Sequence, residues 1–245
     1  MTPRTFLTGE WRYLAMLNYR VDSALLEPLV PRGTSLDLWH GATYVSLVGF
    51  LFRDTRVLGV PVPRHRHFEE VNLRFYVRRE TGSEVRRGVT FIREIVPRRA
   101  IAIVARLAYN EPYVAMPMRH AIGVQGHPDD APDFVGYDWR QGADWSGLTV
   151  NASGRATSLV RGSEAEFITE HFWGYTRQRD GGTVEYRVAH PSWRTWTVHA
   201  ASVRGDLSAL YEPELGRVVA RSPDSAFLAE GSRIEVYTPV RLEAD

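Results

Sequence analysis

The chain has 245 residues and a formal net charge of +1, and all 30 of its basic residues are arginine because it contains no lysine and also no cysteine. These absences exclude imine formation by a side-chain amine, thiolate nucleophiles, zinc–thiolate sites and iron–sulfur clusters. The sequence lacks the basic excess of nucleic-acid-binding proteins, the run of about 20 apolar residues of a membrane span, and a signal peptide. We therefore expect one domain over residues 1–245 in a cytoplasmic protein without nucleic-acid or membrane partners.

The N-terminal quarter predicts two strands and a short helix. Residues 10–21 are rich in Trp, Tyr, Leu and Met and predict a strand. Asp22 is a good helix N-cap, and the short helix it starts should end by Val30, before Pro31. The continuous apolar run 42–52 predicts a strand buried on both faces. Residues 55–67 contain two prolines and predict a loop.

The clearest strand is 69–79, where apolar and polar residues alternate strictly. Residues 88–96 should return as its antiparallel partner after a turn at Thr81–Gly82. The segment 97–109 carries apolar residues at helical spacing and predicts a helix that stops before Pro112.

The C-terminal half predicts mostly hairpins, with one further helix. Ser163 and Glu166 form a capping-box pattern, which predicts a helix from Ser163 to about Trp173. The expected strands are 135–141, 145–152, 175–179, 183–190, 193–203 and 233–240. Many strands with few helices indicate an α+β fold built on an antiparallel sheet or barrel.

One face of strand 69–79 carries the polar residues Glu70, Asn72, Arg74 and Tyr76. If this strand belongs to a barrel with a cavity, that face forms a polar pocket, with Arg20 and Glu94 as partners from neighbouring strands. The alternative is that the same face is simply the solvent side of a half-buried strand. Alternation alone does not separate the two.

Two histidine-containing segments have alternative interpretations. His65 and His67 have a spacing that recurs in metal sites, but no third ligand accompanies them, so we expect a surface pair and no metal. The aromatic segment around His171 can form a pocket wall or anchor a helix on the sheet. No P-loop, G-x-G-x-x-G or G-x-S-x-G motif occurs, so the sequence predicts no cofactor and argues against a serine hydrolase.

Several segments between about residues 5 and 240 resemble the YqjF-like family of bacterial proteins. That family is in turn similar to the acetoacetate decarboxylase superfamily, whose opening segment resembles Tyr19–Asp22 here. The segments that carry the YqjF-like resemblance are 10–19, 44–50, 68–74, 91–94, 109–113 and 173–176.

The superfamily resemblance implies a cone-shaped, mainly antiparallel β-barrel with a few flanking helices around a ligand cavity. It implies that Arg20 matches the arginine that binds the substrate carboxylate. The catalytic lysine pair of the decarboxylases falls near Tyr109–Tyr113 here, where Glu111 stands in place of an amine. The lysine mechanism therefore cannot be transferred to this chain.

These observations predict a barrel that binds a small molecule, with lyase-like or isomerase-like acid–base chemistry on a small oxo-acid or polyketide-like compound. Glu70 or Glu111 is the expected general base, and Tyr113 the donor to a developing oxyanion. The expected substrate-binding residues are Arg20, Asn72, Arg74 and His171. The alternative is a non-catalytic ligand-binding or sensor protein that kept the cavity. The sequence leaves the substrate and a homo-oligomeric state open.

Overall fold

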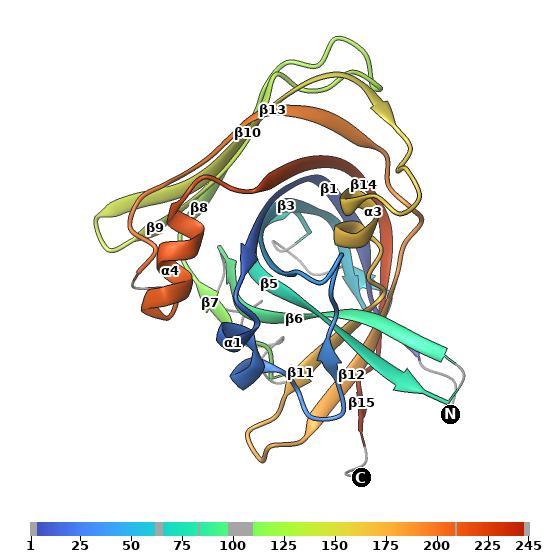
Figure 1. Cartoon of the computed structure of the whole chain (residues 1–245). Helices are drawn as coiled ribbons and strands as arrows, with labels where there is room; N and C mark the ends of the chain where they lie inside the picture. The colour runs from blue at the N-terminus through green and yellow to red at the C-terminus, as the bar shows by residue number, and fades with distance from the viewer. Residues whose placement is uncertain (1–3, 62–65, 83, 98–109, 209, 243–245) are drawn as a thin grey trace.

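The computed structural model describes residues 4–61, 66–82, 84–97, 110–208 and 210–242 (Figure 1). The described part contains strands and a few short helices in one hydrogen-bonded 15-stranded sheet. The strands are β1 Thr5–Val21, β2 Ser35–Leu36, β3 Thr43–Val57, β4 Val60–Pro61, β5 Phe68–Thr81, β6 Glu84–Val96, β7 Tyr113–Ala115, β8 Met118–Ile122, β9 Phe134–Gln141, β10 Asp144–Thr157, β11 Trp173–Arg177, β12 Thr183–Ala189, β13 Thr195–Arg204, β14 Ser225–Tyr237 and β15 Val240–Arg241. The helices are α1 Ser23–Leu26, α3 Glu164–Thr169 and α4 Pro213–Ala220, and a 3₁₀ turn, η1, spans Glu27–Leu29.

The long strands close into a ring. Neighbours pair in the order β12, β11, β6, β5, β3, β1, β14, and the pairing of Val188 with Val236 joins β12 back to β14. Most pairs are antiparallel, whereas β11 and β7 run parallel to β6. Figure 1 shows β1, β3 and β5 curving around a central space, with α3 at the rim of the ring.

A second layer covers part of the outside of the ring. From β14 the sheet continues through β13, β10, β9 and β8, which arch over β1 and β3 in Figure 1. The layers are in close contact at Gly49 of β3, where an added Cβ would lie 2.5 Å from the ring of Tyr137 in β9. No larger residue fits at Gly49 unless the two layers separate.

Strand β5 is buried on both faces from Glu70 to Val77, because it lies between the central space and the second layer. Its apolar residues, such as Leu73 and Phe75, face outward and pack in one core with Tyr137 and Trp139 of β9. Its polar face points into the ring, where Tyr76 packs with a second, inner core. The interpretation of that face as a solvent face is therefore wrong.

A β-bulge in β6 changes which side chains face the inside of the ring. Leu73 pairs with Arg93, but Arg74 pairs with Phe91, so Ile92 is the extra residue on β6. Residues three apart on a regular strand point to opposite faces. The bulge instead lets both Phe91 and Glu94 line the interior pocket described below.

The predicted strands are all present, with shifted ends. Asp22 caps α1, accepting a 2.9 Å hydrogen bond from the Ala24 amide, as predicted. The predicted loop 55–67 is wrong in part, since β3 continues to Val57 and pairs with β4. The predicted helix 97–109 lies almost entirely outside the described residues.

The predicted helix from Ser163 to Trp173 is too long. Ser163 accepts a 3.2 Å hydrogen bond from the Glu166 amide, so the N-cap is as predicted. Helix α3 nevertheless ends at Thr169, and Trp173 starts β11, whose backbone pairs with Gly88 of β6. Backbone pairing with the ring decided where the helix ends.

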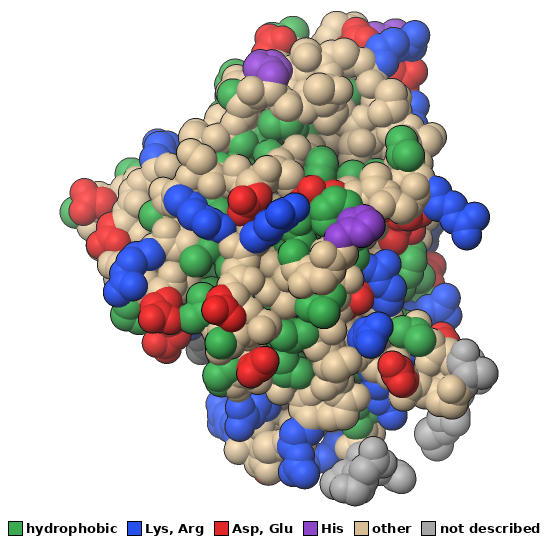
Figure 2. All heavy atoms as spheres, viewed as in Figure 1, with side chains coloured by type: hydrophobic (Ala, Val, Ile, Leu, Met, Phe, Trp, Pro, Cys, Tyr) green, Lys and Arg blue, Asp and Glu red, His purple; other side chains and the backbone are tan. Residues whose placement is uncertain are grey.

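Helix α4 was missed because Gly216 lies within it and no side chain caps its start. No helix among the described residues is long and apolar enough to cross a membrane. Figure 2 shows arginine and carboxylate side chains intermixed on the visible face, in keeping with the small net charge.

Candidate functional site

A cavity of about 230 Å³ lies inside the ring, lined mainly by apolar and aromatic side chains. Its polar side chains come from widely separated segments, since Glu70 and Arg74 lie on β5, Glu94 on β6 and Tyr186 on β12. The remaining polar lining residues are Thr55, Glu111, Tyr113, Thr169, His171 and His190. A mostly apolar cavity with a few convergent polar groups is typical of small-molecule sites.

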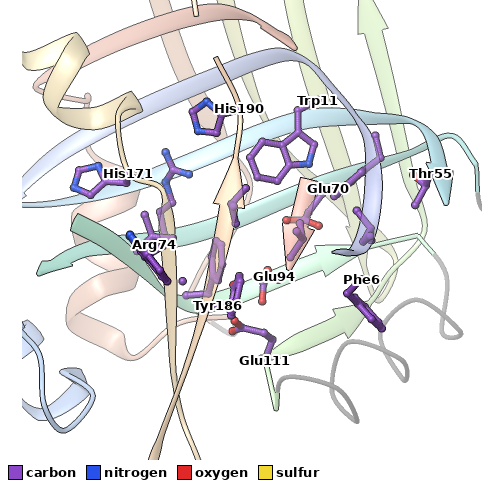
Figure 3. A pocket seen from close by; sticks show the side chains of 18 of the residues that line it. Phe6, Trp11, Thr55, Glu70, Arg74, Glu94, Glu111, His171, Tyr186 and His190 are labelled. Carbon is purple, nitrogen blue, oxygen red and sulfur yellow. The ribbon is translucent and has the colours of Figure 1, made fainter. Parts of the chain in front are cut away.

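Three glutamates, Glu70, Glu94 and Glu111, gather in this cavity (Figure 3). Their exposed fractions are only 3%, 2% and 5%. Strand pairing places Glu94 beside Asn72 on one side and beside Tyr113 on the other. The sheet therefore fixes the positions of Glu70 and Glu94, whereas Glu111 lies in the segment just before β7.

Hydrogen bonds orient these carboxyl groups, and the side chain of Glu94 is hydrogen-bonded to Tyr113 and to Glu111. Glu70 accepts from Asn72 Nδ2 and from the Tyr113 hydroxyl, both at 3.1 Å. Glu111 Oε1 accepts from Thr176 Oγ1 at 2.5 Å and from the Tyr186 hydroxyl at 2.8 Å. Oε2 of Glu94 and Oε2 of Glu111 are both buried, in keeping with two carboxyl groups that contact each other and share a proton.

Burial raises the pKa of all three carboxyl groups. It brings the pKa of Glu70 and of Glu111 to about 7, although their hydrogen bonds act in the opposite direction. Burial, together with the neighbouring Glu111 and Glu70, holds the pKa of Glu94 well above its usual value. Carboxyl groups with a pKa near neutrality can both accept and donate a proton, as general acid–base catalysis requires.

Arg74 lies near the other end of the cavity and is 9% exposed. Its Nη2 donates a 3.3 Å hydrogen bond to the carbonyl oxygen of Ile168, and its buried Nε has no partner. The described residues place no carboxylate within ion-pairing distance of this guanidinium. A buried charge is normally paired, so the cavity leaves Arg74 suited to an anionic ligand.

His171 lies close to Arg74 in Figure 3 and is 7% exposed. Burial lowers its pKa to about 4, so the imidazole is neutral near neutral pH. Its Nε2 lies 3.3 Å from Oδ2 of Asp37. The same oxygen atom accepts a 2.6 Å hydrogen bond from Nε of Arg87, with which Asp37 forms an ion pair. Because that carboxylate accepts, Nε2 carries the proton, and Nδ1 is a buried acceptor without a partner.

A comparison with protein families identifies the chain. The model of DUF2071, described as an uncharacterised conserved protein, matches residues 8–233. The chain belongs to the DUF2071 family. A stretch of 110 residues is 29% identical to the uncharacterised protein YqjF of Bacillus subtilis (strain 168), and the alignment spans 44% of each chain.

Solved structures similar to this DUF2071 protein are acetoacetate decarboxylases and related enzymes. The acetoacetate decarboxylase of Legionella pneumophila has a TM-score of 0.67 at 14% identity, with 99% of this chain and 90% of that chain covered. An acetoacetate decarboxylase-like enzyme from Sphingomonas wittichii RW1 has a TM-score of 0.63 at 15% identity over 98% and 94%. The enduracididine biosynthesis enzyme MppR has a TM-score of 0.68 at 12% identity over 99% and 89%. At these identities the likeness shows a shared fold.

The structure of this family member brings most of the predicted site residues together. Glu70, Arg74, Glu111, Tyr113 and His171 all line the cavity. Asn72, predicted to bind substrate, is buried beside the cavity and instead donates to Glu70. Asn72 thereby orients that carboxyl group, and its contact with a substrate stays a prediction.

The expectation that Arg20 joins this site is wrong. Arg20 is exposed, and its Nε donates to the Tyr44 hydroxyl at 2.8 Å. The cavity contacts β1 at Phe6, Leu7 and Trp11, and Trp11 lies nine residues from Arg20. At about 3.3 Å per residue this separation is roughly 30 Å along the strand, so Arg20 lies at the far end of β1.

Sequence reasoning missed Thr176 and Tyr186, the two donors to Glu111. They lie on β11 and β12, which join the ring beside β6, far from Glu111 in sequence. The hairpin signal at Asp180–Gly182 predicted these strands, but no local pattern indicates which carboxyl group they meet.

No group of His, Cys, Asp or Glu in the described part of the chain is arranged to hold a metal ion. His65 lies outside the described residues, and His67 accepts a hydrogen bond from the Asp54 amide at 3.4 Å.

Proposed function

We propose that this protein binds a small anionic molecule, such as an oxo-acid or a polyketide-like fragment, inside the ring. We further propose that it acts on this ligand by acid–base chemistry of the lyase or isomerase type. The observation that carries the proposal is the buried, unpaired guanidinium of Arg74 in a cavity that also holds proton-exchanging carboxyl groups. The ring would be a cone-shaped barrel within a single acetoacetate decarboxylase-like domain over residues 1–245, in a cytoplasmic protein.

Each polar group has a separate part in this chemistry. Arg74 binds the carboxylate or enolate oxygen, because a guanidinium presents parallel donors to two oxygens. Glu70 or Glu111 removes a proton from carbon, since burial raises the pKa of both to about 7. Burial also raises the pKa of Tyr113 well above its usual value, so its phenol stays protonated and can donate to an oxyanion. His171 Nδ1 accepts a hydrogen bond from a hydroxyl group of the ligand.

A Schiff-base route is not open to the side chains, because the chain has no lysine. The proton chemistry therefore has to proceed without the electron sink that an imine provides. The alternative is an enolate intermediate. A carboxyl group removes the proton, and Arg74 and Tyr113 stabilise the negative charge on the enolate oxygen.

The test is proton exchange on the α-carbon, the carbon atom next to the keto group. Pyruvate, acetoacetate and 2-oxoglutarate are incubated with the protein in D₂O, and NMR follows loss of the α-proton signals and any new products. We expect exchange or turnover with at least one of these compounds. The rate should fall at least tenfold in whichever of Glu111→Gln and Glu70→Gln removes the general base. Glu80→Gln, an exposed position on β5, is the control. Binding without exchange or turnover supports the sensor alternative.

A further inference from the structure

The cavity has two ends with opposite and unmatched chemistry. Figure 3 shows Arg74 and His171 on one side, and Glu94 and Glu111 on the other. Arg74 lowers the pKa of Glu70 by its charge, but the guanidinium and this carboxyl group form no ion pair. The two ends therefore do not neutralise each other.

The acidic end lacks a cation. The carboxyl groups of Glu94 and Glu111 are hydrogen-bonded to each other, which requires a shared proton, and no arginine of the described residues forms an ion pair with either. Lysine cannot supply the charge, because the chain has none. Two buried carboxyl groups in contact either share a proton or bind a cation, because both cannot ionise side by side without one.

The rest of the cavity lining is mainly apolar and aromatic. It includes Trp11, Phe52, Phe68, Phe91 and Trp193. Such walls offer water little compensation, but they suit a short alkyl chain, and aromatic faces attract ammonium groups. The three glutamates are not arranged as metal ligands, which leaves an organic cation as the fitting partner.

We propose that the ligand is a zwitterion that carries an anionic group for Arg74 at one end and a protonated amine for Glu94 and Glu111 at the other. This inference rests on the proposed function and specifies its substrate class. The protein would thus not provide an amine to its substrate but would receive one from it.

The separation of the two ends favours a ligand whose charges lie at opposite ends of a chain. Glu94 pairs with Asn72, which lies two residues from Arg74 on β5, so the Cα atom of Glu94 is roughly 7 Å along the strand from Arg74, at about 3.3 Å per residue, and one strand across. An α-amino acid carries both charges on one carbon atom. An ω-amino acid places several methylene groups between them, and the apolar walls can bury these groups.

Binding of an ammonium group has a proton signature. In the empty cavity at pH 7, Glu94 holds a proton and Glu111, with a pKa raised to about 7, holds one part of the time, because burial raises both pKa values and the carboxyl groups oppose one another's ionisation. The titratable and charged groups around Glu94 and Glu111 are Glu70, Tyr113, Tyr186 and the more distant Arg74. A bound cation stabilises the ionised carboxylates, so binding should release protons.

Calorimetric titration of the whole protein at pH 7 tests the inference with matched probes. The amino acids 4-aminobutyrate, 5-aminopentanoate and 6-aminohexanoate are each compared with butyrate, pentanoate or hexanoate, which lack the amine. We expect at least one amino acid to bind at least tenfold more tightly than its matched acid. Titrations in buffers of different ionisation enthalpy should show proton release for the amino acid only.

Two variants test which residue binds the amine of the ligand and which residue binds its anionic group. Glu94→Gln keeps the shape of the side chain and should abolish most of the tenfold advantage while leaving the affinity for the matched acid unchanged. Arg74→Gln should weaken both ligands at least tenfold. The exposed β5 residues provide matched controls, Glu80→Gln and Arg78→Gln, which should change neither affinity.

The outcomes separate this inference from the proposed function. If no amino acid binds better than its matched acid in the wild-type protein, or if the advantage survives in Glu94→Gln, the zwitterion inference is overturned. The anion site still stands in that case, provided that Arg74→Gln weakens the acids. If Arg74→Gln changes no affinity at all, the proposed function fails with it. The wild-type comparison decides the question even if a variant does not fold.

Discussion

Nη2 of Arg74 donates a 3.3 Å hydrogen bond to the carbonyl oxygen of Ile168, the penultimate residue of α3. This contact ties the guanidinium on β5 to the C-terminal end of the helix at the rim of the ring. A backbone carbonyl can hold a guanidinium in place without neutralising it. The charge of Arg74 therefore remains available to a ligand.

The first prediction concerns Arg74 itself. Arg74→Gln should weaken binding of small carboxylates such as pyruvate at least tenfold, and Arg74→Lys should restore only part of the loss. An ammonium group is a point charge on a flexible stem and cannot present two parallel donors. Calorimetry measures the affinities, with Arg78→Gln as the exposed control on the same strand. Equal affinities in wild type and Arg74→Gln would remove Arg74 from the site.

The second prediction concerns stability and pH. The pKa of Glu111 is raised by burial from 4.5 to about 7 in the folded protein, so the folded state binds more protons than the unfolded state across this window. The contribution of this carboxyl group to stability is therefore complete below about pH 4.5 and is lost as the pH rises through 7. In Glu111→Gln the free energy of unfolding should therefore decrease by roughly 2–3 kcal/mol less over this pH range than it does in the wild-type protein.

Urea unfolding at pH 5, 6 and 7 measures this slope, and Glu80→Gln should leave it unchanged. The amide oxygen of the variant can still accept from Thr176 and Tyr186, so the comparison isolates the ionisable proton. An identical slope in wild type and Glu111→Gln would mean that this carboxyl group titrates normally.

The third prediction concerns Gly174 of β11, which pairs with Tyr186 of β12. The phenol ring lies over the glycine, and a Cβ there would be 2.1 Å from Tyr186 Cζ. Gly174→Ala should displace the ring from Glu111 and cost roughly 1–3 kcal/mol of folding free energy. Adding Tyr186→Leu should recover part of that loss by making room. If Gly174→Ala is as stable as wild type in urea, the ring does not occupy this position.

The fourth prediction concerns covalent trapping. Borohydride reduction in the presence of pyruvate or acetoacetate should give no side-chain adduct, because no lysine is present. Intact-mass and peptide mass spectrometry measure the result, and the α-amino group at the N-terminus provides the comparison, since no side chain carries an amine. A stable adduct on a peptide from the cavity wall would contradict the acid–base proposal.

The fifth prediction concerns metals. Protein purified without an affinity tag should contain no stoichiometric transition metal, since cysteine is absent and His67 is engaged with the Asp54 amide. Elemental analysis provides the measurement. One equivalent of zinc, nickel or iron that disappears in His67→Ala would refute this expectation.

The sequence by itself determined the local elements and the chemistry that is ruled out. Strict alternation over Glu69–Arg79 predicted β5 and separated its polar face from its apolar face, because successive side chains of a strand point in opposite directions. The capping pattern at Ser163 and the hairpin signal at Asp180–Gly182 located their turns for equally local reasons. The absence of lysine excluded a side-chain imine without any structure.

Only the tertiary structure decided which face of β5 is inside and which residues share the cavity. Alternation is symmetric, so the polar face could have met solvent until ring closure and the second layer buried both sides. Both Glu94 and Arg20 were expected to face the same cavity. The bulge at Ile92 turns Glu94 into the cavity, whereas Arg20 lies at the far end of the long strand β1 and is exposed. These outcomes depend on pairing between distant strands, which a single sequence does not encode in any local pattern.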